Sequence, residues 1–102
     1  MKRYDPVPKS SSRTFKILRR HAMRRAEIRL SKPINRRIYL DLCKAISTQK
    51  KVGICEAIQH LEKCSRIRSK WLVRIGDVYC VVIWDRKRHA VCTFLKEVND
   101  GI

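Results

Sequence analysis

Apolar residues in the first half of the chain recur every three or four positions, which is the period of an α-helix. A first helix is expected up to about Leu30, with a buried stripe formed by Phe15, Leu18, Ala22, Ala26 and Leu30. A second helix is expected from Asn35 to Thr48, with a buried face formed by Ile38, Leu42, Cys43 and Ile46. Ser11 or Ser12 and Asn35 are the candidate N-terminal caps, because their side-chain oxygens accept hydrogen bonds from free helix N–H groups.

The second half of the chain changes to β-branched and aromatic residues, which favour strands. Strands are predicted at 71–75, 78–84 and 89–95, joined by a tight turn at Gly76-Asp77 and a basic turn at 85–88. In the preceding stretch, 54–64, helical spacing is kept by Ile54, Ile58 and Leu61. We nevertheless expect a strand around Ala57–Lys63, with a short helix as the alternative. The predicted fold class is therefore α+β, with two N-terminal helices packed on a small antiparallel sheet of three to four strands.

The chain has 102 residues, of which 44% are hydrophobic, so it is long enough for one modest core. We expect a flexible basic arm at 1–11, a single α+β domain at 12–97 and a tail at 98–102. The formal net charge is +16, and a field of that sign attracts polyanions, so nucleic acid is the expected partner. No apolar stretch is as long as a membrane span, and the first residues lack the apolar centre of a secretory signal. We therefore expect no membrane partner and a cytoplasmic location, in a bacterium or an infected host cell.

The five cysteines show no Cys-x-x-Cys pair. Their odd number and the lack of a secretory signal argue against a disulfide framework. Most of them lie among apolar neighbours, as small buried thiols do. The spacing Cys55-x4-His60-x3-Cys64, with His89 and Cys92 further on, fits no standard zinc pattern, so we expect no metal and no other cofactor.

The first predicted helix carries a histidine among arginines. Residues four apart share a helix face, so His21, Arg25 and Arg29 form a column at the border of the apolar stripe, flanked by Arg20 and Arg24. Arginine binds phosphate, and histidine moves protons near neutral pH. This combination is typical of a site that acts on a phosphodiester. The plain alternative is a structural histidine beside a solvated basic face.

Basic residues are also frequent in the second half of the chain. Arg74 lies in a predicted strand, from which it faces either the helices or solvent, and a guanidinium in a cleft binds phosphate through two hydrogen bonds. The hydroxyl of Thr93, in the last strand, bonds either a phosphate oxygen or a neighbouring carbonyl. Contacts with the phosphate backbone are expected from Arg66, Arg68, Lys70, Arg86, Lys87 and Arg88. Base stacking and core packing are the two alternatives for Trp71, Tyr79 and Trp84.

Four segments of the chain together resemble a known group of proteins: His21-Ala22-x-x-Arg25-Ala26-x-x-Arg29-Leu30, Leu72-Val73-Arg74-Ile75-Gly76, Val81-Val82-Ile83-Trp84-Asp85 and Val91-Cys92-Thr93-Phe94-Leu95. Over residues 13–96 the layout is similar to that of small phage and bacterial proteins of the barnase, colicin tRNase and RelE group of metal-independent ribonucleases. The resemblance implies two helices followed by a four-stranded antiparallel sheet with RNA on its concave face. It also implies acid–base work by His21, phosphate binding by Arg25, Arg29 and Arg74, and a place for Thr93 in the active-site strand. The chain departs from the pattern at Cys92 and Phe94, where aliphatic residues are usual, and this departure affects packing more than chemistry.

The first hypothesis is a toxin-like or phage-encoded endoribonuclease that cleaves RNA by attack of the 2′-hydroxyl, with the catalytic residues His21, Arg25, Arg74 and Thr93. No second acid or base is obvious, and the candidates are His60, Glu27 or a lysine. The alternative is a non-catalytic RNA- or DNA-binding phage or bacterial protein, which needs only the charge and the sheet. RNA, either transfer or messenger RNA, is expected ahead of DNA as the partner. An acidic antitoxin or host protein is the other partner that the charge permits.

Overall fold

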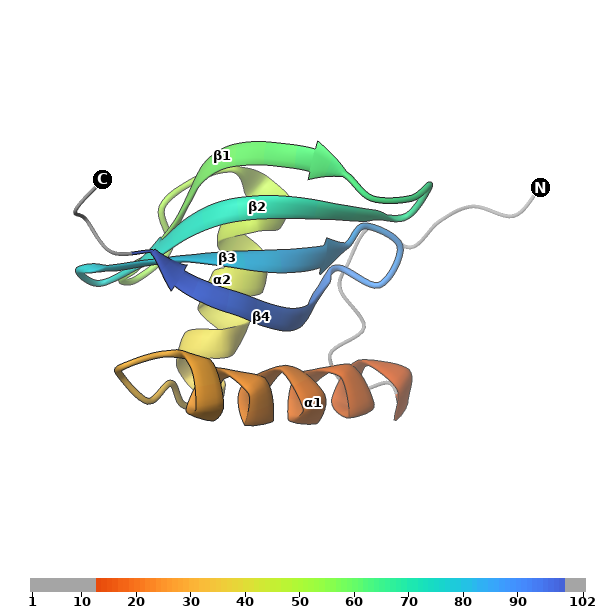
Figure 1. Ribbon diagram of the computed structural model, residues 1–102. Helices are drawn as coiled ribbons and strands as arrows, with labels where there is room; N and C mark the ends of the chain where they lie inside the picture. The colour runs from red at the N-terminus through yellow and green to blue at the C-terminus, as the bar shows by residue number, and fades with distance from the viewer. Residues whose placement is uncertain (1–12, 99–102) are drawn as a thin grey trace.

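The computed structural model describes residues 13–98, in which two helices precede a four-stranded antiparallel sheet (Figure 1). The elements are α1 (Arg13–Arg29), α2 (Arg36–Thr48), β1 (Cys55–Lys63), β2 (Arg68–Ile75), β3 (Val78–Asp85) and β4 (Ala90–Val98). The strands lie in the order β1-β2-β3-β4, so each one pairs with its neighbour in the sequence. The predicted α+β class is confirmed. The expected arm at 1–11, the serine cap and the residues after Val98 lie outside the described residues.

Helix α2 crosses one face of the sheet and supplies more buried core residues than α1 does (Figure 1). It begins as predicted, since the Asn35 side chain accepts a hydrogen bond from the Ile38 N–H at 2.8 Å. The predicted apolar face is confirmed at Leu42, Cys43 and Ile46, which are buried, whereas Ile38 is only half-buried. The largest buried side chain of α2 is one that the pattern did not indicate. Tyr39 is fully buried and its hydroxyl donates to the Val91 carbonyl at 2.7 Å, which ties α2 to β4.

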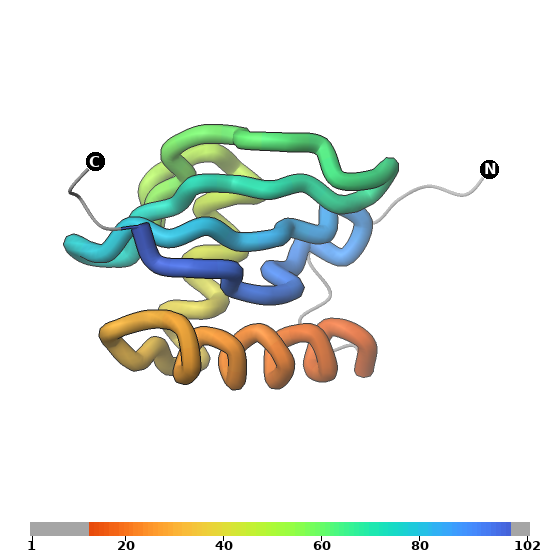
Figure 2. The backbone as a smooth tube through the Cα atoms, in the orientation of Figure 1, coloured from red at the N-terminus to blue at the C-terminus, as the bar shows by residue number. Residues whose placement is uncertain are grey.

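Helix α1 lies beside β4, as both views of the backbone show (Figures 1 and 2). Its buried residues are Phe15, Ala22 and Ala26, as the sequence pattern predicts, and Leu18 and Leu30 are partly buried against the core. The chain just beyond α1 is bonded to the last strand, because the Ser31 N–H donates to the Glu97 carboxylate at 2.6 Å. The first helix therefore covers the β4 side of the sheet, and β1 forms the opposite edge of the sheet in the described part of the chain.

The uncertain stretch 54–64 is a strand, β1, and the alternative of a short helix is wrong. Its pairing with β2 shifts register between Ala57 and Gln59 and again between His60 and Glu62. The residues between these positions, Ile58 and Leu61, are therefore bulged and exposed. Two bulges three residues apart break the two-residue alternation of a strand, and this explains why the apolar residues of the segment keep a helical spacing.

Both predicted turns are confirmed. Gly76 and Asp77 join β2 to β3, and Gly76 has a φ of 65°, which a glycine adopts without strain. The β3–β4 turn covers residues 86–89, and its last residue, His89, also has a positive φ, 54°. The last strand extends to Val98, three residues beyond the predicted end at Leu95, because it continues to pair with β3 as far as Tyr79. No helix within residues 13–98 is long and apolar enough to cross a membrane.

Candidate nucleic-acid interface

The three residues of the predicted column on α1 have different surroundings. Four residues turn an α-helix by about 400°, so each step along the column rotates it by about 40°. His21 is exposed, Arg25 is half-buried, and the Arg29 guanidinium donates to the Phe94 carbonyl at 3.1 Å. Arg29 is therefore partly engaged in holding α1 against β4, while His21 is exposed.

The two predicted site residues on the sheet share a face but lie far apart. Val73 and Ile75 are in the core under α2, so Arg74 and its face partners lie on the opposite side of the sheet. Arg74 on β2 pairs with Tyr79, whereas Thr93 on β4 pairs with Ile83, which is four residues further along β3, so the two residues are also two strand spacings apart. At about 3.3 Å per residue and 4.8 Å between strands, their backbone positions are about 16 Å apart.

Arg74 is also engaged with a carboxylate. Its Nη2 atom lies 2.7 Å from the Glu56 carboxylate on β1, and both side chains are half-buried. Because Arg74 and Thr93 lie this far apart, the structure does not bring the four predicted catalytic residues into one cluster. Their catalytic roles stay predictions.

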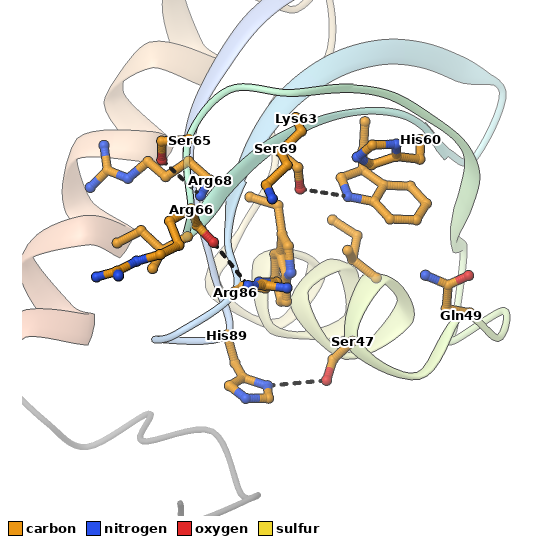
Figure 3. Close-up of a pocket in the computed structure, with 14 residues that line it drawn as sticks. Ser47, Gln49, His60, Lys63, Ser65, Arg66, Arg68, Ser69, Arg86 and His89 are labelled. Carbon is orange, nitrogen blue, oxygen red and sulfur yellow. Dashed lines mark hydrogen bonds between the residues drawn. The ribbon is translucent and has the colours of Figure 1, made fainter.

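A pocket lies on the face that α2 covers, beyond the C-terminal end of that helix (Figure 3). It has a volume of about 370 Å³ and is bounded by the end of α2, the β1–β2 hairpin and the β3–β4 turn. We call it the basic pocket, because the charged or titratable side chains on its wall are Lys63, Arg66, Arg68, Arg86, His60 and His89. No aspartate or glutamate of the described chain lines it.

The cations of the basic pocket differ in how far their charge is compensated. The Arg68 Nε atom lies 3.6 Å from the Asp85 carboxylate, which also bonds Arg88, so Arg68 is partly neutralised. Among residues 13–98, no carboxylate lies within salt-bridge distance of Lys63, Arg66 or Arg86. These three side chains therefore give the pocket an uncompensated positive charge.

The β1–β2 and β3–β4 loops are tied together at the pocket. Arg86 donates from its backbone N–H to the Ile67 carbonyl at 2.7 Å and from its guanidinium to the Arg66 carbonyl at 2.9 Å. Asp85, which is 0% exposed, accepts hydrogen bonds from the backbone N–H groups of Lys87 and Arg88 at 3.0 and 2.9 Å. This buried carboxylate sets the turn that carries Arg86 and His89 to the pocket rim.

Two histidine–tryptophan pairs line the basic pocket. The rings of His60 and Trp71 meet edge to face with centroids 5.2 Å apart, and those of His89 and Trp84 do so at 6.3 Å. His89 is held from α2 as well, because Ser47 Oγ lies 3.2 Å from its Nδ1 atom. Figure 3 shows His60 and His89 on different sides of the pocket, with Arg86 between them in this view.

The basic residues of this site are recognisable in the sequence, but their grouping is not. Arg66, Arg68 and Arg86 were expected to bind phosphate, and the structure brings them to one pocket. Lys70, by contrast, pairs with Glu62 at 3.2 Å on the other face of the sheet. Arg20 and Arg24 lie on α1, in a separate hollow of about 360 Å³ that Glu27 also lines. From the sequence, His60 is a candidate second acid or base and, with His89, part of a spacing that fits no standard zinc pattern. For a role of His89 in binding RNA, its place in a basic turn is the one available signal.

Within residues 13–98, no three histidine, cysteine or acidic side chains are grouped as metal ligands. All five cysteines are free, and only Cys64 is exposed. The fold and the site thus define a small α+β protein with a basic, aromatic-walled pocket. No family model, no curated protein and no solved structure matches the chain.

Proposed function

We propose that the protein binds RNA and holds the phosphate backbone at the basic pocket. The observation that carries this proposal is the cluster of Lys63, Arg66 and Arg86, which have no carboxylate partner in the described chain and surround a pocket without an acidic wall residue. The formal net charge of +16 adds a long-range attraction for any polyanion. The five free thiols fit a reducing compartment, so we infer a cytoplasmic setting for this role.

Charge reversal at one pocket residue tests the proposal. Arg66→Glu is compared with Lys96→Glu, which changes the net charge equally but lies on the opposite sheet face, where Lys96 pairs with Val81. Binding of a fluorescein-labelled single-stranded RNA is followed by anisotropy at several salt concentrations. Each lost phosphate contact reduces the slope of log K against log salt by about 0.7 for a single strand. We expect that reduction in Arg66→Glu and no change of slope in Lys96→Glu.

Two results would contradict the pocket as the interface. Equal losses in the two variants would mean that the RNA responds only to net charge. A larger loss in Lys96→Glu would locate the interface on the sheet face of Arg74 and Thr93, the arrangement implied by the resemblance to ribonucleases.

A second candidate function is metal-independent RNA cleavage, and the observation that favours it is the pair of histidines, His60 and His89, on the wall of the basic pocket. In this reaction one imidazole removes the proton of the RNA 2′-hydroxyl, and the oxygen bonds to the adjacent phosphorus. The bond from phosphorus to the 5′-oxygen breaks, and the other imidazole protonates the leaving oxygen. The products are a 2′,3′-cyclic phosphate and a 5′-hydroxyl.

Incubation of RNA with the protein in EDTA tests this second function. We compare His60→Asn, His89→Asn and His21→Asn with the unchanged protein. Cyclic phosphate ends that disappear in the two pocket variants support cleavage at the pocket, whereas loss only in His21→Asn supports the column on α1. Intact RNA that is nevertheless bound leaves RNA binding as the sole function.

A further inference from the structure

The basic pocket has the size of a small part of a nucleic acid and is too small for a double helix. Its volume of about 370 Å³ lies at the lower end of the range for small-molecule sites, about 300 to 1,000 Å³. A duplex keeps its bases stacked inside and offers only its outer edges to a pocket of this kind. A single strand has unstacked bases that turn outward and enter pockets with aromatic walls.

One wall of the pocket is suited to a flat, apolar ligand group. His60 is exposed, and Trp71 is half-buried with its Nε1–H already donating to Ser69 Oγ at 3.1 Å. The planes of the two rings are inclined by 75°. In such an edge-to-face pair one ring uses only its edge, so both of its faces are left uncovered by the other ring. A planar base can therefore stack at this wall.

The other side of the pocket is suited to an anion. Figure 3 places Arg66 and Arg86 across the pocket from His60, and the two arginines come from loops that a hydrogen bond holds together. A guanidinium binds phosphate oxygens with a planar fork of donors. One wall of the pocket is thus suited to stacking and the opposite side to phosphate binding, and both belong to a pocket of about 370 Å³.

We propose that the basic pocket accepts one unpaired nucleotide of a single-stranded RNA, with its base against His60 and Trp71 and its phosphate on Arg66 and Arg86. The proposal rests on the proposed RNA binding and adds the substrate class, which is single-stranded RNA. Every base has a π-face, so stacking of this kind is tolerant of sequence. The protein therefore prefers unpaired over paired RNA without strict base selection.

The test uses the full chain and three probes: a 12-nucleotide single-stranded RNA, a duplex of the same sequence, and inorganic phosphate. The chain has two tryptophans, and both line the pocket, but Trp84 is only 5% exposed whereas Trp71 is half-buried. Each probe is titrated into the unchanged protein and into Trp71→Phe, and the fluorescence of the variant is subtracted from that of the unchanged protein to give the emission of Trp71. We expect the single strand to quench Trp71, phosphate to leave its emission unchanged, and the duplex to bind at least about 10-fold more weakly.

Affinity measurements complete the test with two neighbouring residues of β1. His60→Ala and Gln59→Ala each remove an exposed polar side chain, but only His60 lines the pocket. Loss of a base-stacking side chain lowers affinity by about 5- to 150-fold, so we expect a loss in this range for His60→Ala and less than a two-fold change for Gln59→Ala.

Equal affinity for single strand and duplex, or RNA binding by anisotropy without quenching of Trp71, overturns the single-nucleotide proposal and leaves RNA binding intact. Lack of binding to both RNAs overturns RNA binding itself, and the proposal falls with it.

Discussion

Asp85 is the residue whose replacement tests most directly how the basic pocket is built. Its carboxylate is 0% exposed and accepts from two backbone N–H groups of the β3–β4 turn. It also bonds the Arg88 guanidinium at 3.1 Å and lies 3.6 Å from Arg68. In Asp85→Asn the amide oxygen still accepts from the turn, but the amide nitrogen faces two guanidinium donors.

The expected cost of Asp85→Asn follows from these contacts. Loss of a hydrogen bond to a charged group costs about 1.5–3 kcal/mol, and the pair with the partly exposed Arg68 adds little. We therefore expect the free energy of unfolding to fall by about 2–3 kcal/mol. Asp85→Ala also removes the acceptor for the turn, and for this variant we expect about 3–5 kcal/mol, as for a broken buried ion pair.

Urea denaturation followed by circular dichroism measures the effect. A loss of about 2–3 kcal/mol lowers the urea midpoint by about 1–2 M at an unchanged m-value. The matched control is Asp77→Asn, since Asp77 is also a carboxylate with a cationic partner, Lys32, but its side chain is 79% exposed. We expect a much smaller shift in the control, because an exposed ion pair contributes little. An Asp85→Asn midpoint within error of the unchanged protein would refute a stabilising role of the buried charge.

Three further predictions follow from the caps, thiols and carboxylates. At pH 8 we expect a thiol reagent to modify only Cys64 rapidly, because Cys64 is the exposed cysteine. Burial raises the pKa of the other four thiols to about 11 or 12, namely Cys43, Cys55, Cys80 and Cys92. Rapid modification of a second thiol would contradict this prediction. Gln49 has a φ of 59°, so Gln49→Gly should be more stable than Gln49→Ala by about 1 kcal/mol in urea denaturation, and equal stabilities would argue against strain. The Lys32 ammonium, by its hydrogen bond and charge, lowers the pKa of the Asp77 carboxyl. The pair therefore stabilises the folded protein at pH values above the pKa that Asp77 has in the unfolded chain. This stabilisation is lost as the pH falls through the lower pKa of the folded state. A carbon NMR titration should show that Lys32→Ala raises the Asp77 midpoint, and an unchanged midpoint would exclude the pairing.

The helices were predictable because their signals are local. The spacing of Phe15, Ala22 and Ala26 and the cap at Asn35 reflect contacts within one turn or one face of a helix, and the structure confirms them. The hairpin at Gly76 was predictable for the same reason, since a turn needs a residue that accepts a positive φ. Strand β1 was difficult to predict because its two bulges depend on its pairing with β2, which the local sequence does not specify.

The grouping of the candidate site depends on contacts between distant segments. His60 and His89 are 29 positions apart in the chain, and α2 supplies Ser47 from further away still. They share a pocket because antiparallel pairing brings the β1–β2 and β3–β4 loops to the same end of the sheet. The same holds for one member of the predicted column on α1. Arg29 bonds to β4, a contact with a distant segment that the four-residue spacing does not specify.

The distribution of acidic residues explains why a chain with a general positive charge has a localised basic site. In the described chain, five of the acidic side chains pair with arginine or lysine: Asp41, Glu56, Glu62, Asp77 and Asp85. Three of these pairs hold cations of the sheet, Arg68, Lys70 and Arg74. Cations without a carboxylate partner in the described chain lie on both helices and at Lys96 of β4, but Lys63, Arg66 and Arg86 are grouped at one pocket. Since interaction with phosphate is strongest where no carboxylate competes, this grouping is what favours the basic pocket in the proposed RNA binding.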